Sequence, residues 1–234
     1  MKIQDSVALV TGANRGLGLA FARALIAHGA RKVYVGARDP STVNLAGVEP
    51  IRLDVTNPVD LAAAVERAGD VQLLVNNAGI SRSADLLGPD AIDGARAEFE
   101  TNVLGPLAVS QAFAPVLARN GGGAILNVLS AASWITLPRA RTYSASKAAA
   151  WSLTNGLRAE LRKQGTQVVA LHVGFIDTDM TSGLTVAKSR PEDVVEAALA
   201  GLEAGELEVL ADGTSRQVKQ ALSLGVYLRD PELR

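Results

Sequence analysis

The chain has 234 residues, of which 48% are hydrophobic and 20% are charged, and its formal net charge at pH 7 is -1. This length allows one large α/β domain, although two small domains are not excluded. The charge is balanced and shows no long run of one sign, so nothing indicates binding to nucleic acid or to an anionic membrane. The absence of cysteine excludes disulfides, thiolate nucleophiles and cysteine-ligated metals.

The first six residues are polar and run directly into an apolar segment, so we expect no signal peptide. We also expect no apolar run long enough to cross a bilayer. The default expectation is therefore a soluble cytoplasmic protein.

A glycine-rich turn follows the first apolar segment. Residues 7–10 are typical of a strand buried on both faces of a parallel sheet, and apolar residues recur at helical spacing from Leu17 to Leu25. The turn between them, residues 11–18, reads TGANRGLG. Strand, glycine turn and helix N-terminus together form a phosphate-binding geometry. A tight turn that binds no ligand has the same pattern, so this segment alone does not show whether the turn binds a phosphate.

The next predicted strand, residues 32–36, carries the residues that bear on cofactor choice. A carboxylate just past this strand favours NAD, whereas a cation suits the 2′-phosphate of NADP. Arg38 lies there, and Arg15 of the glycine turn can approach the same phosphate. Asp39 precedes a proline, and we interpret it as a turn residue. The pattern favours NADP(H).

The remaining segments alternate between strands and helices. Strands are predicted at residues 51–55, 71–75, 124–129, 168–173 and 207–210, and helices at 61–68, 89–119, 143–161 and from 191 onward. The tail from Thr214 is short and mixed, and within it Val218, Ala221, Leu222 and Leu224 can form one apolar helical stripe. The pattern predicts a single doubly wound Rossmann-type domain over residues 1–234, with a parallel sheet of about seven strands and helices on both faces. The cofactor half covers about 1–120, and the catalytic half covers about 121–234.

Tyr143 and Lys147 lie four residues apart, which places them on one face if the segment is helical. A nearby ammonium favours the phenolate and lowers the pKa of a tyrosine toward the range of an acid–base catalyst. A packing pair with a solvated amine has the same spacing.

Five motifs, taken together, carry a resemblance to a known family. They are Thr11-Gly12-x-x-x-Gly16-x-Gly18, Asn76-Asn77-Ala78-Gly79, Asn102, Ser130 and Tyr143-x-x-x-Lys147, and they span nearly the whole sequence. The chain resembles a short-chain dehydrogenase/reductase of the compact, single-domain, carbonyl-reductase-like branch. The family usually has Pro-Gly after the sixth strand, where this chain has Val173-Gly174.

The resemblance implies roles for these residues. Tyr143 would exchange a proton with the substrate oxygen, and Ser130 would hold that oxygen. Lys147 would bind the nicotinamide ribose and, together with the positive nicotinamide of the oxidised cofactor, lower the pKa of Tyr143. Asn102 would hold a water that links Lys147 to solvent. The implied cofactor-binding residues are Gly12, Asn14, Arg15, Gly16, Leu17, Gly18, Arg38, Asp54, Val55, Asn76, Ala78, Gly79, Tyr143, Lys147, Gly174, Ile176 and Thr178.

Apolar and aromatic residues near the catalytic set are candidates for the substrate pocket: Trp134, Phe175 and Met180, together with Ser130 and Tyr143. Ordinary packing is nearly as good an interpretation for Trp134. We interpret His28 and His172 as core or surface histidines rather than metal ligands, and Arg139 and Arg141 as solvated. No metal site is predicted.

The sequence therefore predicts an NADPH-dependent oxidoreductase that reduces an uncharged ketone or aldehyde to an alcohol, reversibly. The alternatives are a reductase of acyl-carrier-protein or CoA thioesters, and a protein that binds NADP(H) without turnover. The apolar helices at 103–117 and 148–161 predict a homodimer or homotetramer.

Overall fold

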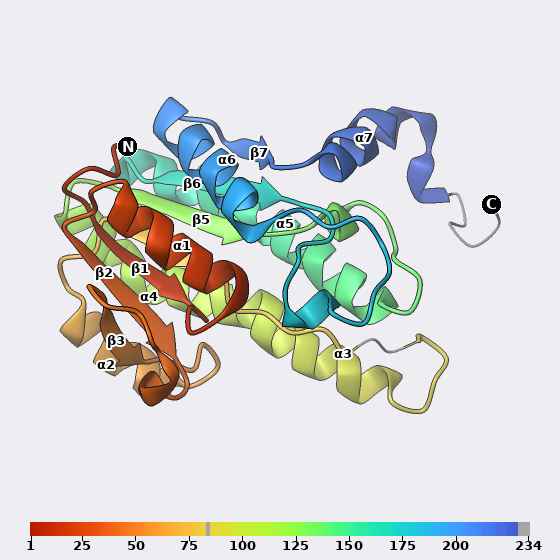
Figure 1. The fold of residues 1–234 in the computed structure, drawn as a ribbon, viewed down its shortest axis with the longest axis horizontal. Helices are drawn as coiled ribbons and strands as arrows, with labels where there is room; N and C mark the ends of the chain where they lie inside the picture. Colours follow the sequence, from red (N-terminus) through yellow and green to blue (C-terminus); the bar gives the residue numbers. More distant parts are fainter. Residues whose placement is uncertain (83–84, 229–234) are drawn as a thin grey trace.

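Seven parallel strands form one sheet, in the order β3-β2-β1-β4-β5-β6-β7 (Figure 1). The computed structural model describes residues 1–82 and 85–228. The strands are β1 (Val7–Thr11), β2 (Lys32–Ala37), β3 (Glu49–Arg52), β4 (Leu73–Asn76), β5 (Ala124–Val128), β6 (Gln167–His172) and β7 (Glu208–Leu210). The chain builds outward from β1 in one direction and from β4 in the other. This confirms the predicted doubly wound sheet, and the reversal between β1 and β4 opens a crevice at their carboxyl ends.

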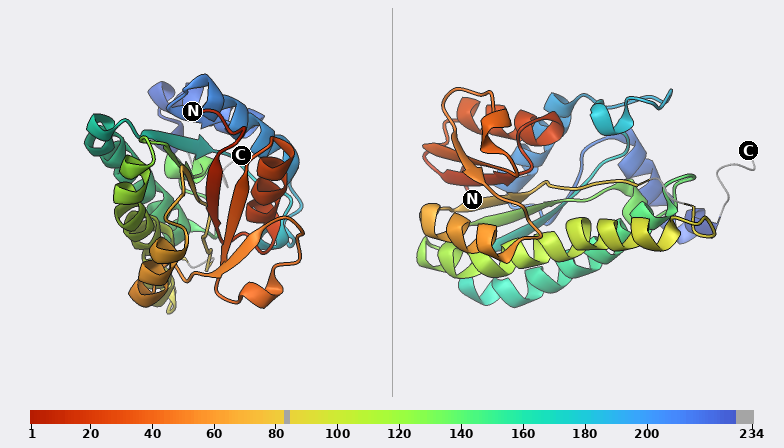
Figure 2. Two further views of the ribbon diagram at one scale, coloured as in Figure 1. Left: turned by 90° about the vertical axis from the view of Figure 1, so that its left-hand side faces the viewer. Right: turned by 90° about the horizontal axis from the view of Figure 1, so that it is seen from below.

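Successive side chains of β1 point to opposite faces of the sheet and enter two different hydrophobic clusters. Ala8 and Val10 pack with α1 (Gly16–Ala27) and α6 (Pro191–Ala204). Val7 and Leu9 pack with α2 (Pro58–Arg67) and α4 (Gly105–Arg119). The helices therefore cover both faces, as the left view of Figure 2 shows. This arrangement explains why the central strands are apolar at every position rather than at alternate ones.

The predicted helix over residues 89–119 is one continuous rod with an irregular centre. α3 (Ala91–Phe99) runs through a π-helical segment, Glu100–Leu104, into α4. The inner face of α4 is fully buried on the sheet, with Phe113 at its centre. Burial of such a side chain contributes about 1.5–3 kcal/mol. The apolar pattern of the sequence gives no sign of this π-helical turn, which contains Asn102.

One described helix is long and apolar enough to cross a membrane by length and composition, namely the rod from Ala91 to Arg119. No such segment was expected from the apolar pattern of the sequence. Its most apolar window has a mean hydropathy of 1.2, and 44% of that window is buried inside the protein. A core helix passes the same test, and the packing of α4 on the sheet gives its apolar residues that role.

The catalytic half ends in a short helical tail. α5 (Arg141–Leu161) lies along the α4 side of the sheet, and α7 (Gly213–Ala221) follows β7. Short 3₁₀ segments at Leu222–Leu224 and Val226–Leu228 complete the described chain. The predicted stripe in this tail is confirmed in part, because Val218 is buried whereas Leu224 is 72% exposed.

Strand β3 differs from its predicted bounds of 51–55. Its pairing with β2 runs from Glu49 to Arg52, because Arg52 pairs with Ala37, the last residue of β2. Asp54 and Val55 therefore lie beyond the strand, at its carboxyl end.

Candidate active site

The glycine-rich turn between β1 and α1 closes tightly against the end of β4. Gly12 and Gly16 have positive φ angles of 64° and 55°, which favour glycine. A Cβ on Gly12 would lie 3.0 Å from the Cα of Ala78, and a Cβ on Gly18 would lie 2.5 Å from the Gly12 oxygen. The turn therefore approaches neighbouring backbone more closely than any side chain allows.

Thr11 and Asn77 hold this turn to β4. The Thr11 hydroxyl accepts hydrogen bonds from the backbone N–H groups of Asn77 and Ala78, each at 3.0 Å. The Asn77 amide donates to the carbonyl oxygens of Thr11, at 2.9 Å, and Gly12, at 3.1 Å. Both residues lie in the motifs that carry the family resemblance, but no role was expected for either. Their contacts show that they brace the turn.

Helix α1 begins directly after the turn. Arg15 occupies the N-cap position, and its side chain makes no capping hydrogen bond. The first N–H groups of the helix therefore keep their capacity to bind an anion, with the favourable end of the helix dipole behind them. Leu17 and Gly18 are buried in the first turn of the helix.

The tip of β2 presents a cation and no free carboxylate. Arg38 is exposed, whereas the Asp39 carboxylate accepts hydrogen bonds from the backbone N–H of Ser41, at 3.0 Å, and from its hydroxyl, at 2.7 Å. Asp39 thus caps the Pro40–Thr42 turn, which supports its interpretation as a turn residue. Asn14 reaches the same turn through Thr42, at 3.1 Å.

The Asp54 carboxylate is also engaged locally. It accepts hydrogen bonds from the Thr56 N–H and hydroxyl. The bond from the Thr56 backbone N–H is the main cause that lowers the pKa of Asp54, and the nearby Arg38 acts in the same direction. Val55 is buried against the first residue of α4, Gly105, where a Cβ would lie 2.7 Å from it.

Arg15 forms an ion pair that the sequence did not predict. Its guanidinium lies 3.1 Å from the carboxylate of Asp179, in the segment after β6, and both side chains are exposed. Thr178 lies beside Gly16, with its methyl group 3.5 Å from the position of a Cβ there. The segment after β6 therefore meets the glycine turn across the crevice.

Ser130, Tyr143 and Lys147 come together at the carboxyl end of β5. Ser130 follows that strand, while Tyr143 and Lys147 lie in the first two turns of α5, as their spacing predicted. The Lys147 ammonium is 5.6 Å from the centre of the Tyr143 ring, and the Ser130 side chain lies close enough to the phenol to affect its pKa.

The pKa of Tyr143 is raised to about 12 in this structure, which is the opposite of the expected direction. Burial of the phenol is the largest cause, because it disfavours the phenolate. Ser130 acts the other way by hydrogen bonding, and the negative charge of Glu98 adds to the increase. Glu98 is fully buried on α3, and the sequence analysis did not identify it.

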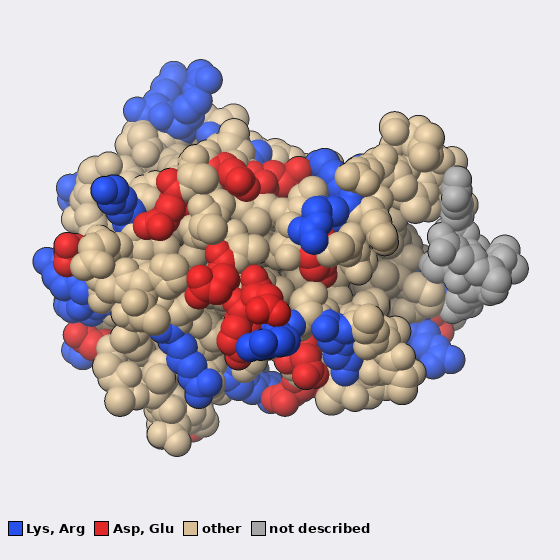
Figure 3. Space-filling model, turned by 45° about the horizontal axis from the view of Figure 1, so that its top comes forward, with Lys and Arg blue, Asp and Glu red and all other residues tan. Residues whose placement is uncertain are grey.

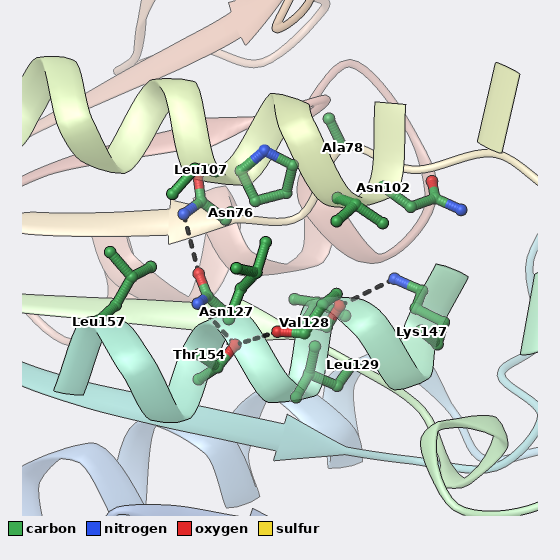
Figure 4. A pocket seen from close by; sticks show the side chains of 14 residues that line it. Asn76, Ala78, Asn102, Leu107, Asn127, Val128, Leu129, Lys147, Thr154 and Leu157 are labelled. Atoms are coloured by element: carbon green, nitrogen blue, oxygen red, sulfur yellow. Dashed lines mark hydrogen bonds between the residues drawn. The ribbon is translucent and has the colours of Figure 1, made fainter. Parts of the chain in front are cut away.

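The surroundings of Lys147 explain why its ammonium does not lower the pKa of Tyr143 in this structure. Its ammonium donates a 2.9 Å hydrogen bond to the Val128 carbonyl and lines a small cavity between α4, α5 and the ends of β4 and β5 (Figure 4). Burial lowers its pKa from 10.5 to about 8. The ammonium therefore bears a desolvation cost of its own and points toward the backbone of β5 rather than toward the phenol oxygen.

The same cavity holds a polar network that begins at Asn76. The Asn76 amide donates to Ser110, at 3.0 Å, and to Asn127, at 2.8 Å, and Asn127 donates to Thr154, at 3.0 Å. These bonds join β4 to α4, β5 and α5 beneath Lys147, as Figure 4 shows for Asn76, Asn127 and Thr154. Asn76 thus ties the end of β4 to α4 and β5.

The side chain of Asn102 is occupied by the loop after β4. Its oxygen accepts from the Ile80 N–H at 2.8 Å, and its amide donates to the Ile80 carbonyl and to Ser146. A Cβ on Gly79 would lie 3.2 Å from the Asn102 oxygen and 3.8 Å from the Lys147 nitrogen. The π-helical turn thus places Asn102 beside Lys147.

Residues around the substrate side of the crevice differ in exposure. Met180 is 54% exposed and Phe175 is half-buried, whereas Trp134 is 8% exposed and packs with Ala131 and Val218. Of the two interpretations of Trp134, ordinary packing and a place in the substrate pocket, the structure supports packing.

A carboxylate from α7 holds the loop after β6. The Asp212 oxygen accepts from the Gly174 N–H at 2.7 Å and from the Ser189 hydroxyl at 3.2 Å. Ile176 pairs with Ser189 in the same loop. These bonds fix the loop that follows Val173, where the family resemblance led us to expect proline. Asp212 is 38 residues from Gly174, so no local pattern indicated it.

Two further expectations, on Arg141 and on the histidines, have outcomes. Arg141 is not simply solvated, because it pairs with Asp85 at 2.6 Å. His28 lies near Glu196 at the surface, and His172 is fully buried. Over residues 1–82 and 85–228, no group of three potential metal-binding side chains occurs.

A doubly wound sheet with a glycine turn at its point of reversal, and a serine, tyrosine and lysine gathered beside it, defines a dinucleotide-dependent oxidoreductase. Sequence comparison agrees, since a profile described as short chain dehydrogenase matches residues 6–189. The chain belongs to the short-chain dehydrogenase family, whose members use a nicotinamide cofactor.

Individual relatives cover almost the whole chain. An uncharacterized oxidoreductase of Staphylococcus saprophyticus is 33% identical over 87% of this chain and 93% of its own length. A short chain dehydrogenase from Burkholderia cenocepacia, solved in complex with NADP, is 41% identical, covers 99% of this chain and 100% of its own, and has a TM-score of 0.93. A 3-ketoacyl-(acyl-carrier-protein) reductase from Brucella melitensis, complexed with NADH, is 30% identical, with coverages of 91% and 99% and a TM-score of 0.79.

Proposed function

We propose that the protein is an NADPH-dependent carbonyl reductase that converts an uncharged ketone or aldehyde to an alcohol, reversibly. The observation that carries this proposal is the meeting of Ser130, Tyr143 and Lys147 at the end of β5, beside the glycine turn. The proposal assigns catalysis to these three residues and Asn102.

The residues around the glycine turn suit a dinucleotide. The glycine turn approaches the end of β4 so closely that a Cβ on Gly12 would fill the space, and α1 offers uncapped N–H groups to a pyrophosphate. Arg15 and Arg38 are the cations that would face a 2′-phosphate, and Asp39 is engaged in its own turn. When bound, the nicotinamide cofactor supplies the ring that exchanges hydride with the substrate and, when oxidised, a positive charge.

The side chains of this chain would supply the proton chemistry. With a pKa near 12, Tyr143 stays protonated across the neutral range and can donate its proton to a developing alkoxide. Ser130 would donate a second hydrogen bond to that oxygen and hold it in place. Lys147, with a pKa near 8, can return a proton toward the site, and the adjacent π-helical turn at Asn102 would hold a water on that route.

The segment after β6 supports an uncharged substrate. It presents Met180, Leu184 and Val186 to solvent with exposures of 54%, 45% and 46%. Apolar surface of this kind suits a ketone or aldehyde with hydrocarbon substituents better than a charged one.

The test is steady-state reduction of a panel of neutral ketones and aldehydes, followed by the loss of nicotinamide absorbance. We expect catalytic efficiency to be higher with NADPH than with NADH. Equal efficiency with both cofactors would remove the proposed preference, and no turnover across a broad panel would remove the proposed reaction.

The thioester alternative can be included in the same assay. It is supported by the likeness to the reductase from Brucella melitensis. It needs a basic surface for an acidic carrier, but Arg141 is paired with Asp85, and charges of both signs are interspersed on the face in Figure 3. Reduction of acetoacetyl-CoA that is faster than that of every simple ketone would favour it. Tight NADPH binding without any turnover would instead favour the non-catalytic reading.

We further propose a homodimer or homotetramer in which the α4 and α5 faces meet. Phe99 and Leu104, near the start of α4, are 37% and 48% exposed although they are large and apolar. Sedimentation of the wild-type protein and of Leu104→Lys tests this, because a monomeric wild type would contradict the proposal.

A further inference from the structure

His172 is a fully buried histidine directly behind the proposed catalytic serine. It is the last residue of β6, and its Nδ1 lies 3.0 Å from the carbonyl oxygen of Ser130. A carbonyl oxygen can only accept, so Nδ1 must carry the proton and Nε2 must carry the lone pair.

An ion pair lies on the other side of the ring. Nε2 is 3.5 Å from the Glu208 carboxylate of β7, and the other Glu208 oxygen is 2.7 Å from the Lys219 ammonium of α7. Nε2 makes no hydrogen bond within the described residues. Lys219 thereby offsets the charge of Glu208 next to the Nε2 lone pair, and Lys147 of α5 is the further charged group that acts on the ring.

Two aromatic rings fix the orientation of the imidazole. Trp134 stacks on it with centroids 3.9 Å apart and planes inclined at 19°, and Trp151 meets it edge-on at 6.4 Å. Lys219 lies over the Trp134 ring at 4.7 Å. The imidazole is therefore held in one place by Trp134, which follows the 3₁₀ turn Ala131–Ser133, by Trp151 of α5 and by the α7 residue Lys219.

The backbone that His172 holds is also the backbone that carries the Ser130 hydroxyl. Within this turn the Ser133 N–H donates to the Ser130 carbonyl, at 3.0 Å, and the Ala132 N–H donates to the Ser130 Oγ, at 3.1 Å. A shift of the carbonyl would therefore move the hydroxyl as well.

We propose that His172 is a positioning residue for Ser130, acting through the Nδ1–H bond to the serine carbonyl. Trp134 and Trp151 hold the orientation of the ring, and Lys219 offsets the Glu208 carboxylate, which would otherwise favour a proton on Nε2. The inference rests on the proposed function, because it assumes that Ser130 binds the reacting oxygen. It adds a residue to which neither the motif comparison nor the sequence analysis assigned a role.

Two substitutions of His172 separate the role of Nδ1 from that of Nε2. Asparagine places an amide donor near the position of Nδ1, whereas glutamine places it near Nε2. We expect His172→Asn to keep the kcat for ketone reduction within about two-fold, and His172→Gln to lower it by about five- to ten-fold, as for loss of one hydrogen bond. The Kd for NADPH should stay unchanged in both. Equal losses in both variants would overturn the proposal.

A double-mutant cycle distinguishes positioning from a general structural effect. In the Ser130→Ala background, His172→Gln should cause no further loss of kcat, because its effect passes through the serine. The same loss in both backgrounds would overturn the role of His172 while leaving the proposed function intact. A Ser130→Ala variant with full activity would instead overturn the proposed function.

The tautomer can be measured without turnover. The chain has only two histidines, so nitrogen NMR of the wild type and of His28→Gln identifies the signals of His172. We expect a protonated Nδ1 and an unprotonated Nε2 at pH 7, and a protonated Nε2 would contradict the proposal.

Discussion

Replacing Lys147 with methionine should make the protein more stable at neutral pH while it impairs catalysis. Lys147 is only 6% exposed, and burial lowers the pKa of its ammonium from 10.5 to about 8. That difference corresponds to a desolvation cost of about 3 kcal/mol while the group is charged. Methionine has a similar volume and no charge. The variant loses the hydrogen bond to Val128, which costs about 1 kcal/mol.

The expected net gain in the free energy of unfolding is therefore about 2 kcal/mol at pH 7, or about 4–8 °C in Tm for a chain of this size. Its pH dependence has a definite sign. Below pH 8 the ammonium is charged in the folded and unfolded states, so the wild type bears the full cost. Between pH 8 and 10.5 the folded protein loses its proton first, so wild-type stability rises with pH and the advantage of the variant disappears.

Denaturant unfolding of both proteins between pH 7 and 10.5 tests this reasoning. Lys163→Met is the matched control, because it removes an exposed lysine and should change stability by less than about 0.5 kcal/mol. A Lys147→Met variant that is less stable than the wild type at pH 7 would refute the assigned cost, and so would a gain that persists unchanged at pH 10.5.

Three further predictions concern the cofactor and His172. Arg38→Gln should weaken NADPH binding by about ten-fold or more, as for loss of a charge-assisted hydrogen bond. The control Arg31→Gln, at another exposed arginine, should leave the Kd for NADPH unchanged. Similar losses of affinity for NADPH and NADH would contradict the role of Arg38. Asp179→Asn should strengthen NADPH binding a few-fold by releasing Arg15, and weaker binding would show that the pair assists the cofactor instead. Burial lowers the pKa of His172 from 6.5 to about 4, so the free energy of unfolding should fall as pH falls from 6.5 to 4, by up to about 3 kcal/mol. Unfolding of the wild type and His172→Asn measures this loss, which should be absent from the variant.

The sequence predicted the architecture because its strands and helices carry different apolar periods. The fully apolar residues 7–10 indicated a strand covered on both faces, and the alternation of such segments with helices predicted the parallel sheet. The spacing of Tyr143 and Lys147 was sufficient to place both on the first turns of α5, because helix geometry fixes that relation.

Other features depend on contacts that no local pattern encodes. The π-helical turn at Asn102 keeps the apolar character of the helix around it, so periodicity gave no sign of it. Asp212 reaches Gly174 only because β7 lies beside β6. The direction of the Tyr143 pKa depends on burial and on Glu98, and spacing alone therefore gave the wrong sign for this structure.

The central claim is that the Tyr143 phenol donates the proton in carbonyl reduction. Its most direct test is the kcat of Tyr143→Phe with NADPH and the best ketone of the panel. We expect kcat to fall by about 10²–10⁴-fold while the Kd for NADPH and the Tm change little. A Tyr143→Phe variant that reduces the ketone at the wild-type rate would contradict the account.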